Sequence, residues 1–229
     1  MTMRILEGKQ EHDLDAEALW EERRGYEHCL VDVGTGDGRF VLRHAKEHPD
    51  TFCLGLDAVA DAMRKEAVRA RRKPTRGGAA NARFLVAAAE DLPGPLEGIA
   101  DLLTVNFPWG SLQRMLVEPV EPQLRRLAAL AVPEARVVIL LNASVFDDHD
   151  YRDRLALPPL DAERARRELV PAYARAGVVV DEVTELAGEI PHRTSWGQRL
   201  VRGSARSTLM LVGRRVADLK APRGVETPR

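Results

Sequence analysis

The sequence predicts an α/β fold, a Rossmann-like sheet of seven mostly parallel strands in which the last strand runs antiparallel. Short apolar runs alternate with helical patterns along most of the chain, which is typical of a parallel sheet covered by helices on both faces. The last two apolar runs have no long helical pattern between them, so we expect them to pair antiparallel. The predicted strands are 29–33, 51–57, 83–89, 101–107, 135–142, 178–186 and 207–216.

Helical patterns fall between several of these runs, and a few segments lie outside the alternation. The predicted helices are 15–24, 39–47, 58–72, 119–130 and 161–176. Residues 3–13 are expected to form a small hairpin, and 143–160 form a long connection. We therefore predict a single domain over 1–216, with an N-terminal extension at 1–27 and an insertion loop at 143–160, followed by a flexible tail at 217–229.

Composition argues against several classes of protein. The 229 residues carry a formal net charge of −1, and no run approaches the roughly 18 apolar residues of a membrane span. The first residues contain no apolar signal core, so we expect a cytoplasmic protein without membrane attachment. Cys29 and Cys53 both lie in apolar runs, which favours buried reduced thiols and excludes a cysteine-rich zinc site. No metal is expected.

Basic residues are concentrated in two places despite the balanced net charge. Between Arg64 and Arg76, seven Lys or Arg residues stand against one Glu. A second group of arginines, which includes Arg199 and Arg206, follows residue 190. Each group is either a solvated surface or a surface that contacts nucleic-acid phosphates.

A glycine-rich turn follows the first predicted strand and opens a helix. Glycines at positions 34, 36 and 38 let a ligand approach the backbone closely. A dinucleotide site of the G-x-G-x-x-G type would need a glycine where Arg39 stands, so this class of site is disfavoured. The G-x-G-x-G spacing after Asp32 is that of S-adenosylmethionine enzymes, in which the acid reaches the methionine ammonium group.

Two further acids follow the next two strands. Asp57 ends the second strand, where a carboxylate can accept both ribose hydroxyls; it can equally cap the helix expected at Ala58, and both roles can hold together. Ala87 and its small neighbours leave a slot for adenine, and Glu90 either addresses the ring edge or caps a helix. Because ligands of open α/β sheets bind at the carboxyl ends of strands, the three acids together predict an S-adenosylmethionine site.

The fourth strand leads into an unusual run, Asn106-Phe107-Pro108-Trp109, at the same sheet edge. Thr104 before it is interpreted as an ordinary strand residue, and Phe107 with Pro108 as a stiff turn. A second tryptophan, Trp196, stands in a polar, glycine-containing loop near the end of the chain. Two tryptophans on loops at one edge can sandwich a planar base, and stacking contributes roughly 1–3 kcal/mol per base.

Five motifs together resemble those of a known family, the aminoglycoside-resistance 16S ribosomal RNA methyltransferases that modify N1 of adenine 1408 (the Kam type). The motifs are VDVGTGDGRF, LGLDA, AAAEDLP, TVNFPWGSL and TSWG. The resemblance covers nearly the whole chain and implies a class I S-adenosylmethionine-dependent methyltransferase. It also implies that Trp109 and Trp196 clamp the flipped adenine. The residues that it assigns to the cofactor, or that stand beside them in the same motifs, are Asp32, Gly34, Gly36, Asp57, Ala87, Glu90, Asn106, Ser111 and Thr194. The residues expected to contact RNA are Lys65, Arg69, Arg71, Arg72, Lys73, Arg199 and Arg206.

The implied reaction needs no catalytic base, since N1 of adenine carries a free lone pair. Catalysis would rest on in-line positioning of a base extruded from its helix. The expected partner is 16S rRNA within the 30S subunit, bound by a monomer, and the expected outcome is resistance to aminoglycosides such as kanamycin and apramycin. The alternatives are a tRNA guanine-N7 methyltransferase, a small-molecule methyltransferase, and a non-enzymatic domain that binds S-adenosylmethionine or RNA.

Overall fold

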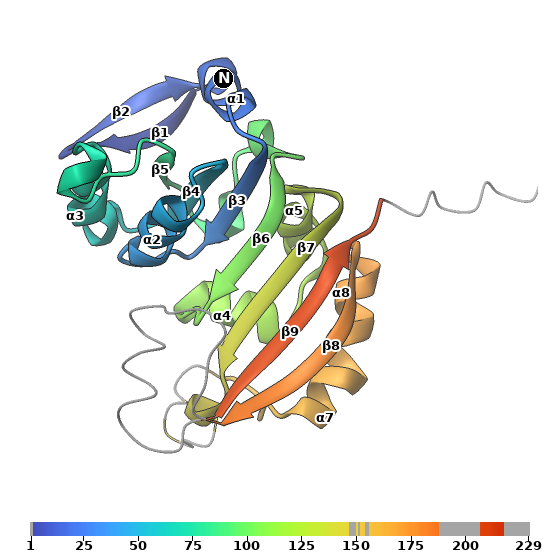
Figure 1. Ribbon diagram of the computed structural model, residues 1–229. Helices are drawn as coiled ribbons and strands as arrows, with labels where there is room; N and C mark the ends of the chain where they lie inside the picture. Colours follow the sequence, from blue (N-terminus) through green and yellow to red (C-terminus); the bar gives the residue numbers. More distant parts are fainter. Residues whose placement is uncertain (1, 147–149, 151, 154–155, 188–206, 218–229) are drawn as a thin grey trace, which may run out of the picture.

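A nine-stranded sheet forms the centre of the protein, with strand order β2-β1-β5-β4-β3-β6-β7-β9-β8 (Figure 1). The computed structural model describes residues 2–146, 150, 152–153, 156–187 and 207–217. The strands are β1 (Thr2–Glu7), β2 (Gln10–Asp15), β3 (His28–Val33), β4 (Thr51–Asp57), β5 (Ala82–Val86), β6 (Ala100–Asn106), β7 (Ala131–Asn142), β8 (Val178–Ala187) and β9 (Ser207–Arg215).

The inner part of the sheet is parallel, as the alternating pattern predicted. β3 pairs with β4 and β6, β4 with β5, and β6 with β7, all in parallel. β9 lies between β7 and β8 and is antiparallel to both, which confirms the predicted antiparallel ending. The fold class is therefore confirmed, with all seven predicted strands present.

The strand count differs from seven because the N-terminal hairpin is part of the sheet. β1 and β2 pair over their full lengths, from Thr2 with Asp15 to Glu7 with Gln10. β1 then joins the sheet antiparallel to β5, where Ile5 is paired with Leu85. Ile5 is 4 % exposed, because its side chain enters the main core. Burial of this apolar face fixes the hairpin on an edge that would otherwise present unpaired backbone groups.

Helices cover the sheet on both faces. They are α1 (Ala16–Arg24), α2 (Arg39–Glu47), α3 (Ala60–Ala70), α4 (Gly110–Val117), α5 (Glu121–Ala129), α7 (Ala162–Arg164) and α8 (Val170–Arg175). α2 and α3 pack on one face, where Val41 and Met63 meet Leu30 of β3. α4, α5 and α8 pack on the opposite face, where Leu116 and Tyr173 join the larger core. A π-helical turn, Ala165–Leu169, joins α7 to α8 just before Pro171, which has no backbone N–H to donate.

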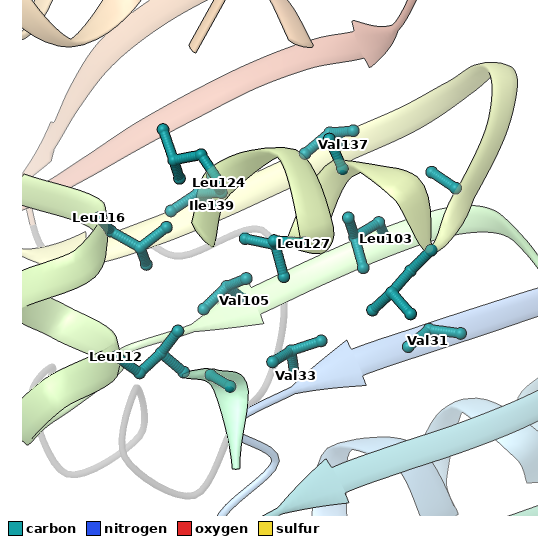
Figure 2. Packing of buried hydrophobic residues seen from close by; sticks show 14 of the residues in the cluster. Val31, Val33, Leu103, Val105, Leu112, Leu116, Leu124, Leu127, Val137 and Ile139 are labelled. Carbon is teal, nitrogen blue, oxygen red and sulfur yellow. The ribbon is translucent and has the colours of Figure 1, made fainter. Parts of the chain in front are cut away.

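α4 is the element that the sequence prediction missed. Its eight residues follow the turn at Trp109, and no helix was expected between the fourth predicted strand and residue 119. Figure 2 shows why the helix forms: Leu112 and Leu116 of α4 point into the core beside Leu124 of α5 and Val105 of β6. The short amphipathic pattern was hidden by the unusual turn residues that precede it. Because α4 begins where β6 ends, it sets one wall of the sheet edge.

Several remaining predictions concern buried thiols and chain segments. Cys29 and Cys53 are both free and buried, as predicted, and burial raises the pKa of the Cys29 thiol to about 12. Among the described residues, no helix has the length and apolar character that a membrane crossing requires. Of the 143–160 connection, the structure describes a 3-10 turn at Ala143–Phe146 and parts of the rest. Most of the 217–229 tail lies outside the described residues, so its predicted flexibility stays a prediction.

Candidate active site

A pocket of about 400 Å³ opens at the carboxyl ends of β3, β4, β5 and β6. This edge is where ligands of open α/β sheets bind. Eight of the nine residues that the sequence assigned to the cofactor line this pocket, and Trp109 lines it as well. The eight are Asp32, Gly34, Gly36, Asp57, Ala87, Glu90, Asn106 and Ser111. Thr194 and Trp196 lie outside the described residues.

Asp32 lies at the floor of the site, at the end of β3. The residue is 1 % exposed, and its Oδ1 accepts hydrogen bonds from Oγ1 of Thr104 at 2.7 Å and Nδ2 of Asn106 at 2.8 Å. Burial raises the pKa of this carboxyl from its ordinary value of 3.8 to about 6, and the two hydrogen bonds oppose the rise. At neutral pH the carboxylate is therefore ionised and poorly solvated. A cationic ligand group such as an ammonium fits it.

Thr104 supports Asp32 from the neighbouring strand, a contact that the sequence prediction missed. Its hydroxyl is completely buried in β6 and donates to Asp32 of the neighbouring strand. The register explains the contact, because Asp32 of β3 is paired with Thr104 of β6. The available signal was a polar residue inside an otherwise apolar strand, since a buried hydroxyl needs a partner.

The glycine turn after β3 is shaped by Asp57. The backbone N–H of Gly36 donates to Oδ2 of Asp57 at 2.8 Å, across 21 residues of sequence. Gly36 has φ of 59°, and a Cβ at this position would meet nothing within 4 Å. Gly36 is also one of the residues that line the pocket. Gly38, with φ of 74°, has no such room, because a Cβ there would lie 2.5 Å from Cε1 of Phe84.

The second oxygen of Asp57 also has a backbone partner. Oδ1 accepts from the N–H of Val59 at 2.9 Å. Helix α3 starts at Ala60, two residues later than predicted, and Asp57 braces the turn before it. A carboxylate has about four lone-pair positions, so each oxygen keeps capacity for one ligand hydroxyl. The ribose role and the bracing role are therefore compatible.

Beyond β5, the chain forms another wall of the pocket. The backbone N–H of Ala87 donates to the carbonyl of Asp57, and residues Ala89–Asp91 form a 3-10 turn. β5 ends three residues earlier than predicted, because the small residues leave the strand to make this turn. Glu90 is half-buried and faces the pocket from the turn. Val59 lines the same pocket while 58 % exposed, an apolar surface that the sequence prediction missed.

A strained turn presents Trp109 at the other side of the pocket. Phe107 has φ of 52°, which a bulky residue adopts only under tertiary constraint. Its ring is buried with Val138 and Leu140 of β7, and its N–H donates to the carbonyl of Leu140 at 2.8 Å. The chain therefore turns out of the sheet after Phe107, and Trp109 is left 39 % exposed at the start of α4.

The arrangement matches a family of known proteins. Residues 4–215 match the family model described as NpmA: 16S rRNA (adenine(1408)-N(1))-methyltransferase. The chain belongs to this family. A 16S rRNA (adenine(1408)-N(1))-methyltransferase from Escherichia coli is 32 % identical over 219 residues, which is 92 % of this chain and 98 % of the relative.

Solved structures of 16S rRNA (adenine(1408)-N(1))-methyltransferases and related resistance enzymes agree with the fold. The aminoglycoside resistance methyltransferase NpmB1 is 38 % identical and superposes with a TM-score of 0.83 over 94 % of this chain and all of the other. A single-site variant of the enzyme from Catenulisporales acidiphilia, crystallised with cosubstrate SAM, has a TM-score of 0.80 at 31 % identity, over 95 % of this chain and 98 % of that one. Membership of this methyltransferase family and S-adenosylmethionine as cofactor are thus confirmed.

The basic surface of this family member lies along α3 and the turn after it. Three of its arginines are held by carboxylates: Arg64 by Asp61 and Glu11, Arg69 by Glu66, and Arg71 by Glu7. The ion pairs of Arg64 and Arg71 tie α3 to the N-terminal hairpin.

Three exposed cations of the same surface differ from these arginines. They are Lys65, Arg72 and Lys73, and in the described part of the chain no carboxylate lies within ion-pairing distance of them. Arg199 and Arg206 lie outside that part.

Proposed function

We propose that the protein transfers the methyl group of S-adenosylmethionine to N1 of adenine 1408 of 16S rRNA in the 30S subunit, and that the modification gives resistance to aminoglycosides such as kanamycin and apramycin. The observation that carries the proposal is the exposed Trp109 beside the pocket that contains Asp32, Asp57 and Glu90. An indole at this edge offers a flat apolar surface for a base next to the expected methyl donor. The names of the relatives support the same target.

The residues of the pocket divide the work of holding the cofactor. Asp57 accepts the two ribose hydroxyls, Glu90 addresses the adenine edge, and the buried carboxylate of Asp32 holds the methionine ammonium group. Ser111, at the start of α4, closes the methionine end. When bound, the cofactor supplies an electrophilic methyl group on a sulfonium.

The target base needs positioning and no deprotonation. Trp109 stacks on one face of the extruded adenine, and Trp196 supplies the opposite wall. The lone pair of N1 forms the new N–C bond while the C–S electron pair goes to sulfur, so no proton leaves in this step. The product carries a positive charge, which stacked indoles stabilise through cation–π attraction of about 0.5–2 kcal/mol. Holding N1 in line with the methyl group is the main source of rate acceleration.

The partner is a folded ribosomal particle, which explains a basic patch on a protein of balanced charge. We infer that Lys65, Arg69, Arg71, Arg72 and Lys73, with Arg199 and Arg206, contact phosphates of 16S rRNA. Such contacts recognise the shape of folded RNA, since RNA helices hide their base edges in a deep groove. The protein would act in the cytoplasm, where the subunit is assembled, and as a monomer.

The test incubates the protein and methyl-labelled cofactor separately with 30S subunits, naked 16S rRNA, tRNA and kanamycin. We expect label in the 30S subunit and a reverse-transcription stop at nucleotide 1408, because a methyl group on N1 blocks base pairing. Label in tRNA or in the drug, with none in the 30S subunit, would overturn the proposal.

A further inference from the structure

The carbonyl oxygen of the Asn106 side chain is a buried acceptor without a donor. The amide nitrogen of this side chain donates to Oδ1 of Asp32 at 2.8 Å. Its Oδ1 accepts no hydrogen bond from the described residues, although it is buried. Asn106 lines the pocket together with Trp109 and Ser111. Leaving a buried acceptor unsatisfied costs about 1–3 kcal/mol, so such a group at a binding site calls for a ligand donor.

The orientation of this amide is set by Asp32. Rotating the amide by half a turn would place its oxygen against the carboxylate, where two acceptors face each other. Oδ1 of Asp32 also accepts from Thr104, and both strands hold these residues in register. The amide nitrogen of Asn106 must therefore face Asp32, and the oxygen must face away from it.

We propose that Oδ1 of Asn106 accepts a hydrogen bond from the 6-amino group of the target adenine and so selects adenine and places its N1. The proposal rests on the function proposed above. It moves Asn106 from the cofactor residues, where the sequence placed it, to the residues that touch the base. Asn106 stands three positions before Trp109, at the point where β6 ends and the turn begins.

A contact with the 6-amino group of adenine also fixes the position of N1. Carbon C6 is bonded both to N1 and to the amino nitrogen, so an acceptor that holds the amino group also holds N1 beside it. As the N1–C bond forms and the C–S bond breaks, positive charge spreads over N1, C6 and the amino nitrogen. The amino N–H becomes a better donor, and its hydrogen bond to Asn106 strengthens in the transition state. The ionised Asp32 behind the amide polarises it in the same direction.

The same oxygen discriminates against other purines. Guanine and hypoxanthine carry a carbonyl oxygen at C6, which would face Oδ1 of Asn106 and leave two acceptors unpaired. Sites built to bond one polar group reject analogues that lack it far more strongly than apolar pockets reject a missing methylene.

The experiment is a double-substitution cycle on reconstituted 30S subunits that carry either adenosine or purine riboside at position 1408. Purine riboside lacks only the 6-amino group. Single-turnover methyl transfer is measured for the wild-type protein and for Asn106→Ala, and S-adenosylhomocysteine binding is measured by calorimetry for both. Comparing the two proteins cancels the lower intrinsic reactivity of purine riboside at N1.

We expect the wild-type rate to fall at least 100-fold more than the Asn106→Ala rate when the amino group is removed. Because Asn106→Ala also removes a donor to Asp32, S-adenosylhomocysteine affinity should fall, but by a much smaller factor than the rate. An equal fall for both proteins would overturn the inference. So would a loss of S-adenosylhomocysteine affinity that matches the loss of rate, since Asn106 would then be a cofactor ligand. Asn106→Ser, which keeps a donor near Asp32 and removes the carbonyl, replaces the alanine variant if that variant does not fold.

The control for the parent proposal is the wild-type protein on subunits with adenosine. If those subunits receive no label, the proposed function fails. If they are labelled and the cycle shows no coupling, only the role of Asn106 fails.

Discussion

The backbone N–H of Gly36 donates to Oδ2 of Asp57 at 2.8 Å, and this bond joins the glycine turn after β3 to the end of β4. Asp57 also accepts from Val59, so one carboxylate shapes both the turn that borders the pocket and the start of α3. The residue proposed to hold the ribose therefore also builds the site around it. Substituting Asp57 should therefore weaken cofactor binding more than it lowers the stability of the hydrophobic core.

Replacing Asp57 by asparagine should weaken cofactor binding. The amide of Asp57→Asn turns one N–H group toward a backbone donor and removes the charge that strengthens the ribose hydrogen bonds, a loss of about 1.5–3 kcal/mol. We expect the Kd for S-adenosylhomocysteine, measured by calorimetry, to rise by one to two orders of magnitude. Asp61→Asn is the matched control, because the Asp61 side chain is 85 % exposed and its ion pair with Arg64 lies at the surface. Equal affinities for both variants would show that Asp57 does not contact the cofactor.

Two glycines of the same turn should respond differently to an added methyl group. Both have positive φ, so each alanine variant carries strain of about 1–2 kcal/mol. Gly36→Ala places its methyl in open pocket space and should lower cofactor affinity with only a modest loss in Tm. Gly38→Ala meets the ring of Phe84 and should lower Tm much further. Thermal unfolding with and without S-adenosylmethionine measures both effects, and a reversed order would contradict the assignment of the pocket.

Cofactor affinity should depend on the ionisation of Asp32. Its pKa of about 6 in the free protein lies above the ordinary 3.8, because burial disfavours the charge and nearby Asp57 adds to the rise. An ammonium group binds the ionised form, so affinity should be constant well above pH 6 and fall by up to tenfold per pH unit below it. The α-amino group of the cofactor stays protonated throughout this window. Calorimetry between pH 5 and 7 measures the effect, and Asp32→Asn should bind weakly without this pH dependence.

The same shift in pKa has a consequence for folding without cofactor. Between pH 3.8 and about 6 the folded protein binds more protons at Asp32 than the unfolded chain does. The contribution of Asp32 to the free energy of unfolding therefore falls as pH rises through this range and stays low above it. Cofactor binding at neutral pH offsets this penalty.

Trp109 should be required for methyl transfer and dispensable for cofactor binding. Trp109→Ala removes the proposed stacking surface, so we expect transfer to 30S subunits to fall at least 100-fold while S-adenosylhomocysteine affinity changes little. Trp20→Ala is the control: Trp20 packs against the core and donates to the carbonyl of Pro95, so its loss should lower Tm and spare transfer below the melting temperature. If cofactor affinity collapses in Trp109→Ala, the indole is a packing residue.

The exposed cations after α3 should act on RNA binding alone. Arg72→Glu should weaken binding to 30S subunits and lower the slope of log K against log salt by about one or more, because each phosphate contact releases counterions. Arg166→Glu in the π-helical turn before α8, on the opposite face of the sheet, should leave both quantities unchanged. Arg71 is a poor choice for this test, since its pairing with Glu7 would turn a reversal into repulsion within the protein. Equal effects of the two reversals would place the RNA surface elsewhere.

The amino-acid sequence was enough to predict the fold class and the acids that meet at one edge of the sheet. Alternating apolar runs report which segments are buried, and acids after successive strands must meet at one edge of a parallel sheet. Asp32, Asp57 and Glu90 were therefore predictable without coordinates, and they line one pocket. The family was also recognisable, because the runs around Trp109 and Trp196 are specific.

The contacts among those residues depend on the three-dimensional arrangement of the strands. Three features depend on neighbours that are distant in sequence. They are the pairing of the N-terminal hairpin with β5, the hydrogen bonds from Thr104 and Asn106 to Asp32, and the left-handed backbone of Phe107. Asn106 and Asp32 are 74 residues apart and meet because β3 and β6 are adjacent strands. Periodicity reports whether a side chain is buried; it does not report which partner the side chain meets, and that partner is what orients the carbonyl of Asn106 away from Asp32.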